Sequence, residues 1–136
     1  MFKHSGRFQL IDFQLSHNEM LLRSYANAER DYNIDILFKG VTSLNIKTTF
    51  YGEINIEVTT KKQSQLAEII MPNEAFIFKI FDKYKIDNFI EAASFGAFKN
   101  KLDFGCTSLG EFMWSPSNEC IYWSHDDEEF KRMFLL

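Results

Sequence analysis

Hydrophobic and polar residues alternate along most of this chain, which predicts β-strands because successive side chains of a strand point to opposite faces. The segment NIDILFKGV, residues 33–41, is typical. Its apolar face carries Ile34, Ile36 and Phe38. Asp35 and Lys39 face the other way or lie at the strand end, and Gly40 allows a turn. Because Asp35 has no catalytic partner in the local sequence, we interpret this segment as a strand rather than as an active site.

Two hairpins are predicted in the first half of the chain. The segments 44–50 and 53–58 both alternate with a period of two. Tyr51-Gly52 lies between them and can reverse the chain, since Gly tolerates the positive φ that hairpin turns need. These two segments should therefore pair with one apolar and one solvated face.

The other predicted hairpin joins 7–15 to 19–25 through a turn at His17-Asn18. The alternation in 8–15 changes phase between Leu10 and Ile11. One extra residue in the ladder, a β-bulge, would place both apolar sets inside. Those sets are Phe8 and Leu10 on one side of the phase change, and Ile11, Phe13 and Leu15 on the other.

The second half continues as strands, with two helical segments. Strands are expected over 75–81, 87–98 and 100–106. Further expectations are a bulge or bend at Gly96, a turn at Lys99–Asn100 and a core position for Cys106. Glu91 is expected to face solvent, and the alternative is a buried functional acid.

Helical spacing of apolar residues predicts a short helix near 64–71, ended by Pro72. A C-terminal helix near 125–134 is predicted from the capping spacing Ser124-x-x-Asp127, with acidic residues first and basic residues last. The expected fold is mainly β, an antiparallel sandwich or partly open barrel with these two helices.

Length and composition bound the class of protein. A chain of 136 residues favours a single globular domain over 1–136. Fifteen Phe and an aromatic share of 16% predict a core built largely from rings. The net charge of −4, without a basic stripe, argues against binding to nucleic acid. Without an apparent secretory signal or membrane span, and with only two Cys, the chain is expected in the cytoplasm, with both thiols reduced and buried.

Motifs for catalysis or cofactor binding are missing from the sequence. Neither the Rossmann nor the P-loop spacing occurs, and neither Ser94 nor Ser108 has both flanking glycines of a nucleophile elbow. His and Cys do not show zinc-binding spacing. The run HDDEE, residues 125–129, could attract a divalent cation, but on a helix its side chains fan apart, so we interpret it as a capped first turn. We predict no cofactor, no metal and no enzymatic activity, while a hydrolase using Asp or Glu stays open because active sites often cannot be recognised without the fold.

The most suggestive segment is FMWSPSNECIYWSH, residues 112–125, where aromatic side chains surround an expected loop. Trp and Tyr beside a loop can form a protein-binding hot spot or the rim of a small-molecule pocket, or can cap one end of the core. The predicted partner- or ligand-binding residues are Trp114, Tyr122, Trp123, Asp126, Asp127 and Glu128.

The stretch FQLIDFQLSHNEMLLRS, followed by NIDILFKGVTSLNIKTTFYGEINI, resembles small, mostly uncharacterised bacterial proteins, some of which are immunity proteins of polymorphic or contact-dependent toxin systems. The resemblance covers residues 8–58, and 92–110 is similar more loosely. It implies a cytoplasmic protein that binds and blocks a cognate toxin, and a net-acidic surface would complement a basic toxin. The alternative function is a small-ligand-binding β domain with an aromatic pocket rim; the sequence does not determine the oligomeric state.

Overall fold

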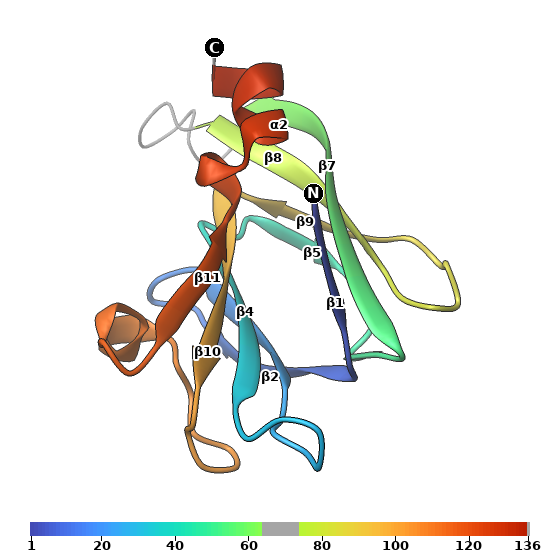
Figure 1. Cartoon of the computed structure of the whole chain (residues 1–136). Coiled ribbons are helices and arrows are strands. Elements are labelled where there is room, and N and C mark those ends of the chain that lie inside the picture. Colours follow the sequence, from blue (N-terminus) through green and yellow to red (C-terminus); the bar gives the residue numbers. More distant parts are fainter. Residues whose placement is uncertain (64–73, 136) are drawn as a thin grey trace.

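Two antiparallel β-sheets face each other in the computed structural model of the chain, which describes residues 1–63 and 74–135 (Figure 1). Sheet A contains, in spatial order, β1 (Phe2–Ser5), β7 (Glu53–Gln63), β8 (Glu74–Phe81), β9 (Asn88–Ala92) and β5 (Ser43–Asn45). Sheet B contains β11 (Glu119–Trp123), β10 (Ser94–Asn100), β4 (Asn33–Lys39), β3 (Glu19–Ser24), β2 (Phe8–Gln14) and β6 (Thr49–Phe50). Of the two predicted architectures, the described strands adopt the sandwich, which confirms the mainly β prediction.

Aromatic rings fill the space between the sheets, as the Phe content predicted. Phe38 of sheet B stacks on Phe95 with ring centroids 5.2 Å apart, and Phe78 of sheet A meets the edge of Phe95 at 5.2 Å. All three side chains are inaccessible to solvent. Since each buried ring removes about 150–250 Å² from water, such contacts supply much of the stability of the sandwich.

The predicted hairpin with its turn at His17-Asn18 is confirmed, including its bulge. Strands β2 and β3 pair antiparallel, and the register shifts between Leu10 and Asp12, so that Ile11 is the extra residue. The bulge keeps Phe13 with the main core, but it turns Ile11 to the outer face of sheet B. Leu15 lies in the turn and is 80% exposed, so the prediction that both apolar sets point inward was wrong for these two residues.

The predicted hairpin of 44–50 with 53–58 is wrong. The segment 44–50 is divided between the sheets, because β5 pairs with β9 in sheet A and β6 pairs with β2 in sheet B. Strand β7 pairs instead with β1 and β8. The turn at Gly52 does occur, with φ of +80°, but it leads the chain from sheet B to sheet A rather than back along the same sheet.

Segment 87–106 also differs from the prediction. It forms two strands, β9 and β10, with a break at Ala93, and β10 runs through the turn predicted at Lys99–Asn100. Residues 101–106 are not a strand, and both Cys106 and Cys120 are exposed rather than buried. The irregularity opposite β11 falls between Ala97 and Phe98, one residue past Gly96.

Glu91 was predicted to face solvent and is instead buried. It is 8% exposed, and its Oε1 accepts a hydrogen bond of 2.6 Å from the Thr42 hydroxyl. The reason is the neighbouring strand: β5 lies along β9 and carries Thr42 to this carboxylate.

A short C-terminal helix is confirmed, with a different cap. A single 3-10 turn, η2 (Ser124–Asp126), precedes α2 (Glu128–Phe130), and the chain continues in a wider π turn, η3 (Lys131–Leu135). Asp127, rather than Ser124, caps α2 by accepting the amides of Glu129 and Phe130. Phe130 is inaccessible to solvent and packs against Phe76, so this helix covers one end of the sandwich (Figure 1). The other predicted helix, 64–71, lies outside the described residues.

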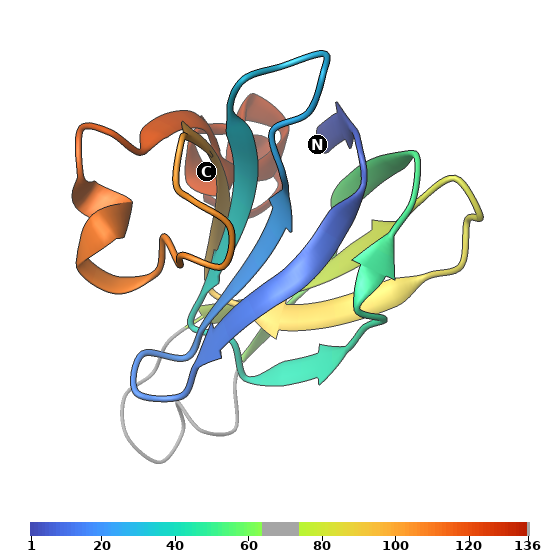
Figure 2. The same cartoon turned by 90° about the horizontal axis from the view of Figure 1, so that it is seen from below.

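The outer face of sheet B is covered by the segment 101–118. Figure 2 shows this segment (orange) on the side of sheet B that faces away from sheet A. It contains the 3-10 helix η1 (Gly110–Trp114), and Leu109 and Met113 pack with Leu21, Leu37 and Phe98 in a second apolar cluster. Strand β4 is therefore buried on both faces, whereas the alternation predicted an apolar face only on the side of Ile34, Ile36 and Phe38.

Candidate functional site

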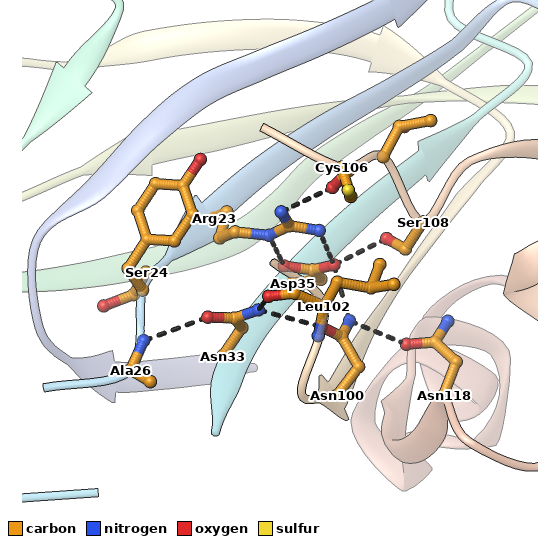
Figure 3. Close-up of polar contacts among 12 residues, drawn as sticks. Arg23, Ser24, Ala26, Asn33, Asp35, Asn100, Leu102, Cys106, Ser108 and Asn118 are labelled. Atoms are coloured by element: carbon orange, nitrogen blue, oxygen red, sulfur yellow. Dashed lines mark hydrogen bonds and ion pairs between the residues drawn. The ribbon is translucent and has the colours of Figure 1, made fainter. Parts of the chain in front are cut away.

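A buried ion pair lies between sheet B and the segment that covers it (Figure 3). Arg23 of β3 and Asp35 of β4 are direct neighbours in the antiparallel register. The Arg23 Nε donates to Asp35 Oδ1 at 2.6 Å, and Arg23 Nη2 donates to Asp35 Oδ2 at 2.8 Å. Both side chains are inaccessible to solvent. This bidentate geometry holds the two strands and both side chains in one arrangement.

The covering segment completes the surroundings of this ion pair. Asp35 Oδ2 also accepts from Asn100 Nδ2 at 2.7 Å and from the Ser108 hydroxyl at 2.6 Å, while Arg23 Nη1 donates to the Cys106 carbonyl at 2.6 Å. Burial alone would lower the pKa of the Arg23 guanidinium, but the hydrogen bonds and the charge of Asp35 outweigh burial and raise this pKa. Arg23 therefore remains a cation, balanced by Asp35.

Three Asn side chains extend this network along the end of sheet B (Figure 3). Asn33 Nδ2 donates to Asn100 Oδ1 at 3.0 Å, and Asn100 Nδ2 donates to Asn118 Oδ1 at 3.0 Å. Asn33 also donates to the Leu102 carbonyl, and Asn118 to the Met113 carbonyl. The network thus connects β4, β10 and both ends of the covering segment.

This network shows the surroundings of Asp35 in the segment NIDILFKGV. Asp35 does have a partner, on the next strand rather than nearby in sequence, but four donors surround its carboxylate and no solvent reaches it. We interpret Arg23 and Asp35 as residues that fix the covering segment in place. Sequence reasoning missed them because the pairing of β3 with β4 had to be known first.

A groove of about 690 Å³ borders this network. Its walls include Tyr32, Lys99, Lys101, Phe112, Ser117 and Glu119. Asn100, only 3% exposed, contributes to the groove and is held by its bonds to Asp35, Asn33 and Asn118. The groove is thus built on a rigid base, and its volume is within the range of small-molecule sites.

The predicted binding residues fall mainly beside a different, smaller pocket. A pocket of about 310 Å³ is lined by Tyr122, Trp123, Asp126 and Asp127, together with Cys120 and Ile121. The structure therefore brings together four of the six predicted residues. Trp114 and Glu128 do not line it: Trp114 is 72% exposed and lies under the Lys39 ammonium, and Glu128 pairs with Lys131.

One hydrogen bond organises the small pocket. The Tyr122 hydroxyl donates to Asp127 Oδ2 at 2.7 Å, while the other Asp127 oxygen caps α2. Burial, reinforced by the charge of Asp127, raises the pKa of Tyr122. Burial alone would raise the pKa of Asp127, but the donors Tyr122, Phe130 and Glu129 lower it instead. Tyr122 thus remains a neutral donor and Asp127 a charged acceptor at neutral pH.

The pocket lies beside an edge strand. β11 has β10 as its one neighbour among the described strands of sheet B, and no strand lies on its other side in Figure 1. Alternate backbone N–H and C=O groups of such a strand point outward without a ladder partner. Residues 119–130 contain five carboxylates and no Lys or Arg. An edge able to pair, a pocket with aromatic walls and a negative local charge therefore coincide.

Two further features concern residues 1–63 and 74–135, namely clusters of metal ligands and helices that could span a membrane. Within these ranges no three His, Cys, Asp or Glu residues are grouped so as to hold a metal ion. Asp35 and Glu91 belong to different sheets, and His125 contacts Ser124, Phe76 and Phe130. No helix within these ranges is both long enough and apolar enough to cross a membrane.

Comparison of the chain with protein-family models, with curated proteins and with solved structures finds no match.

Proposed function

We propose that this chain is a non-enzymatic protein-binding domain, and that its binding surface is the acidic edge. The acidic edge comprises β11, the small pocket and the N-terminal part of α2, residues 119–129. The observation that supports the proposal best is the exposed edge of β11 directly beside a pocket with Tyr and Trp walls. Edge strands bind extended peptide segments through backbone hydrogen bonds, while adjacent pockets select side chains.

The charge of the acidic edge indicates the chemistry of its partner. Glu119, Asp126 and Glu129 are exposed, and Asp127 carries a negative charge inside the pocket. A partner segment rich in Lys or Arg would therefore be attracted at long range and selected over acidic competitors. Ile121 is 38% exposed on the same strand and offers apolar contact area between the acidic residues.

The resemblance over residues 8–58 suggests the biological setting of this binding, which is toxin immunity in the bacterial cytoplasm. A cognate toxin with a basic surface would suit the acidic edge, and steric blockade would need no catalytic group in the inhibitor. Under this proposal, co-expression of the chain with a toxin encoded beside its gene protects the host cell. Undiminished killing by every neighbouring toxin would contradict the immunity role while leaving protein binding to be judged by the next experiment.

Two matched edge variants test the proposed surface. Ile121→Lys places a cation on the acidic edge, and Leu44→Lys makes the same change on β5, which ends sheet A and exposes Leu44 to a similar 42%. We expect Ile121→Lys to weaken capture of the partner from extracts of the native organism at least about tenfold, because a cation repels a basic segment and removes apolar contact. Leu44→Lys should leave capture unchanged. Equal effects of the two variants would contradict the assignment to β11.

A further inference from the structure

We propose that the groove beside the buried network is a second, separate site, which binds a small organic anion with a flat apolar ring. Its volume of about 690 Å³ is more than twice that of the pocket beside β11. Cavities of about 300–1,000 Å³ are the usual size of small-molecule sites. This assignment places the small-ligand function in a different part of the molecule from the rim of Trp114, Tyr122 and Trp123 that the sequence suggested.

The walls of the groove indicate a flat apolar body. Tyr32 and Phe112 contribute aromatic surface, and Leu102 and Pro116 add aliphatic surface. Rings and aliphatic side chains favour a planar apolar group because dispersion and burial of apolar area act on both of its faces.

The charged residues of the groove indicate an anionic group. Lys99 and Lys101 line it, against the single carboxylate of Glu119. The Lys99 ammonium lies 4.5 Å from the centroid of the Tyr32 ring, and no ion pair of Lys99 occurs among the residues that the structure describes. Lys101 pairs at 3.1 Å with Asp31, but both side chains are largely exposed, so that pair is weak and can exchange for a ligand anion.

The base of the groove is already organised for binding. The Asn100 side-chain nitrogen donates to Asp35 and Asn118, and its side-chain oxygen accepts from Asn33 and from the Leu102 amide. A side chain with all of these bonds cannot reorient freely. Little conformational entropy is then lost when a ligand docks against it, which favours binding.

Two probes that share a ring and differ in charge test this inference. Naphthalene-carboxylate and naphthalene-methanol are titrated into the full chain, and binding is followed through backbone amide NMR shifts. We expect the carboxylate to bind at least about tenfold more tightly than the alcohol, since hydrogen bonds to a charged group add about 1.5–3 kcal/mol, equivalent to about ten- to a hundredfold. The shifted amides should be those of the groove, Leu102 and Ser117 among them.

Lysine variants identify the group that recognises the anion. Lys99→Met is expected to weaken carboxylate binding about tenfold and to leave the alcohol unchanged, and Lys101→Met should act in the same direction if Lys99→Met does not fold. Lys83→Met is the matched control, because Lys83 also lies over a Tyr ring, that of Tyr84, but does not line the groove. It should have no effect on the binding of either probe. Equal affinities for the two probes, no binding of either, shifts confined to other surfaces, or unchanged binding in both groove variants would overturn the inference. None of these outcomes depends on the partner of the acidic edge.

Discussion

Replacement of Asp35 by Ala is the most informative perturbation of the folded structure. The Asp35 carboxylate accepts four hydrogen bonds from three residues, two of them from Arg23, and both members of the ion pair are inaccessible to solvent. Asp35→Ala therefore leaves a guanidinium buried without its counter-charge. Removal of one member of a buried ion pair costs about 3–5 kcal/mol, a large part of the roughly 5–15 kcal/mol by which a domain is stable.

Urea unfolding followed by circular dichroism measures this loss. With a slope of about 2 kcal/mol per molar urea, a loss of about 4 kcal/mol lowers the unfolding midpoint by about 2 M. Asp31→Ala is the matched control, because it removes a carboxylate from the exposed pair with Lys101, and it should leave the midpoint unchanged.

Asp35→Ala combines two destabilising effects, the unpaired charge of Arg23 and the loss of the other hydrogen bonds to Asp35. The double variant Arg23→Met/Asp35→Leu separates them. Apolar replacement of both partners removes the unpaired charge, so this protein should be more stable than Asp35→Ala. Some loss relative to the wild type remains, because Asn100 and Ser108 no longer have their acceptor. A midpoint shift below about 0.5 M for Asp35→Ala, or a double variant no more stable than the single one, would refute the reasoning.

Three further predictions concern other parts of the structure. Asp82 is buried, which alone would raise its pKa, but donors including the Lys47 ammonium and the Tyr51 amide lower this pKa below that of the unfolded chain. The Asp82 carboxylate therefore stabilises the fold above the unfolded pKa of about 3.9, and this stabilisation is lost as the pH falls through the folded pKa. In thermal melts, Asp82→Asn should lose less stability than the wild type between pH 5 and 2. Gly96→Ala should cost about 1–3 kcal/mol in urea unfolding, because the new methyl group would collide with the Trp123 ring, and a neutral result would mean that this ring moves freely. Asp127→Ala removes the cap of α2 and should cost about 0.5–2 kcal/mol and increase proteolysis after residue 123, and unchanged proteolysis would contradict the role of the cap.

Local patterns of the sequence predicted those parts of the fold that depend on neighbouring residues. The phase change between Leu10 and Ile11 predicted the β-bulge, because an extra residue is what reverses the facing of later side chains. Alternation also predicted β4 and β8, and the Phe content predicted a core of rings.

Pairing between distant strands could not be predicted in the same way. Alternation assigns a face to each residue of 44–50 but does not choose a partner, and the chain divides this segment between the two sheets. For the same reason the contact between Arg23 and Asp35 could not be predicted, because it depends on the register of β3 against β4. Nor does any period mark 101–118 as a segment that covers sheet B. Its contacts with the sheet are made by isolated residues, the apolar Leu109 and Met113 and single Asn, Ser and carbonyl groups, which follow no regular spacing.

The structure brings some of the predicted binding residues together. Tyr122, Trp123 and Asp127 meet because β11 and α2 are adjacent in the chain, which made their proximity accessible to sequence reasoning. Trp114 is also near in sequence, but η1 places its ring against the Lys39 ammonium rather than in the wall of the pocket. The groove beside Asn100 was not predicted, because its walls come from four separated parts of the chain.

Hydrogen–deuterium exchange of the chain, alone and with the protein that it captures, tests the proposed binding edge most directly. Amides of β11 that point away from β10 should exchange rapidly in the free protein and become protected in the complex, together with the pocket residues up to Asp127. Protection confined to β5 or β1, the edges of sheet A, with β11 exchanging as before, would contradict the proposal.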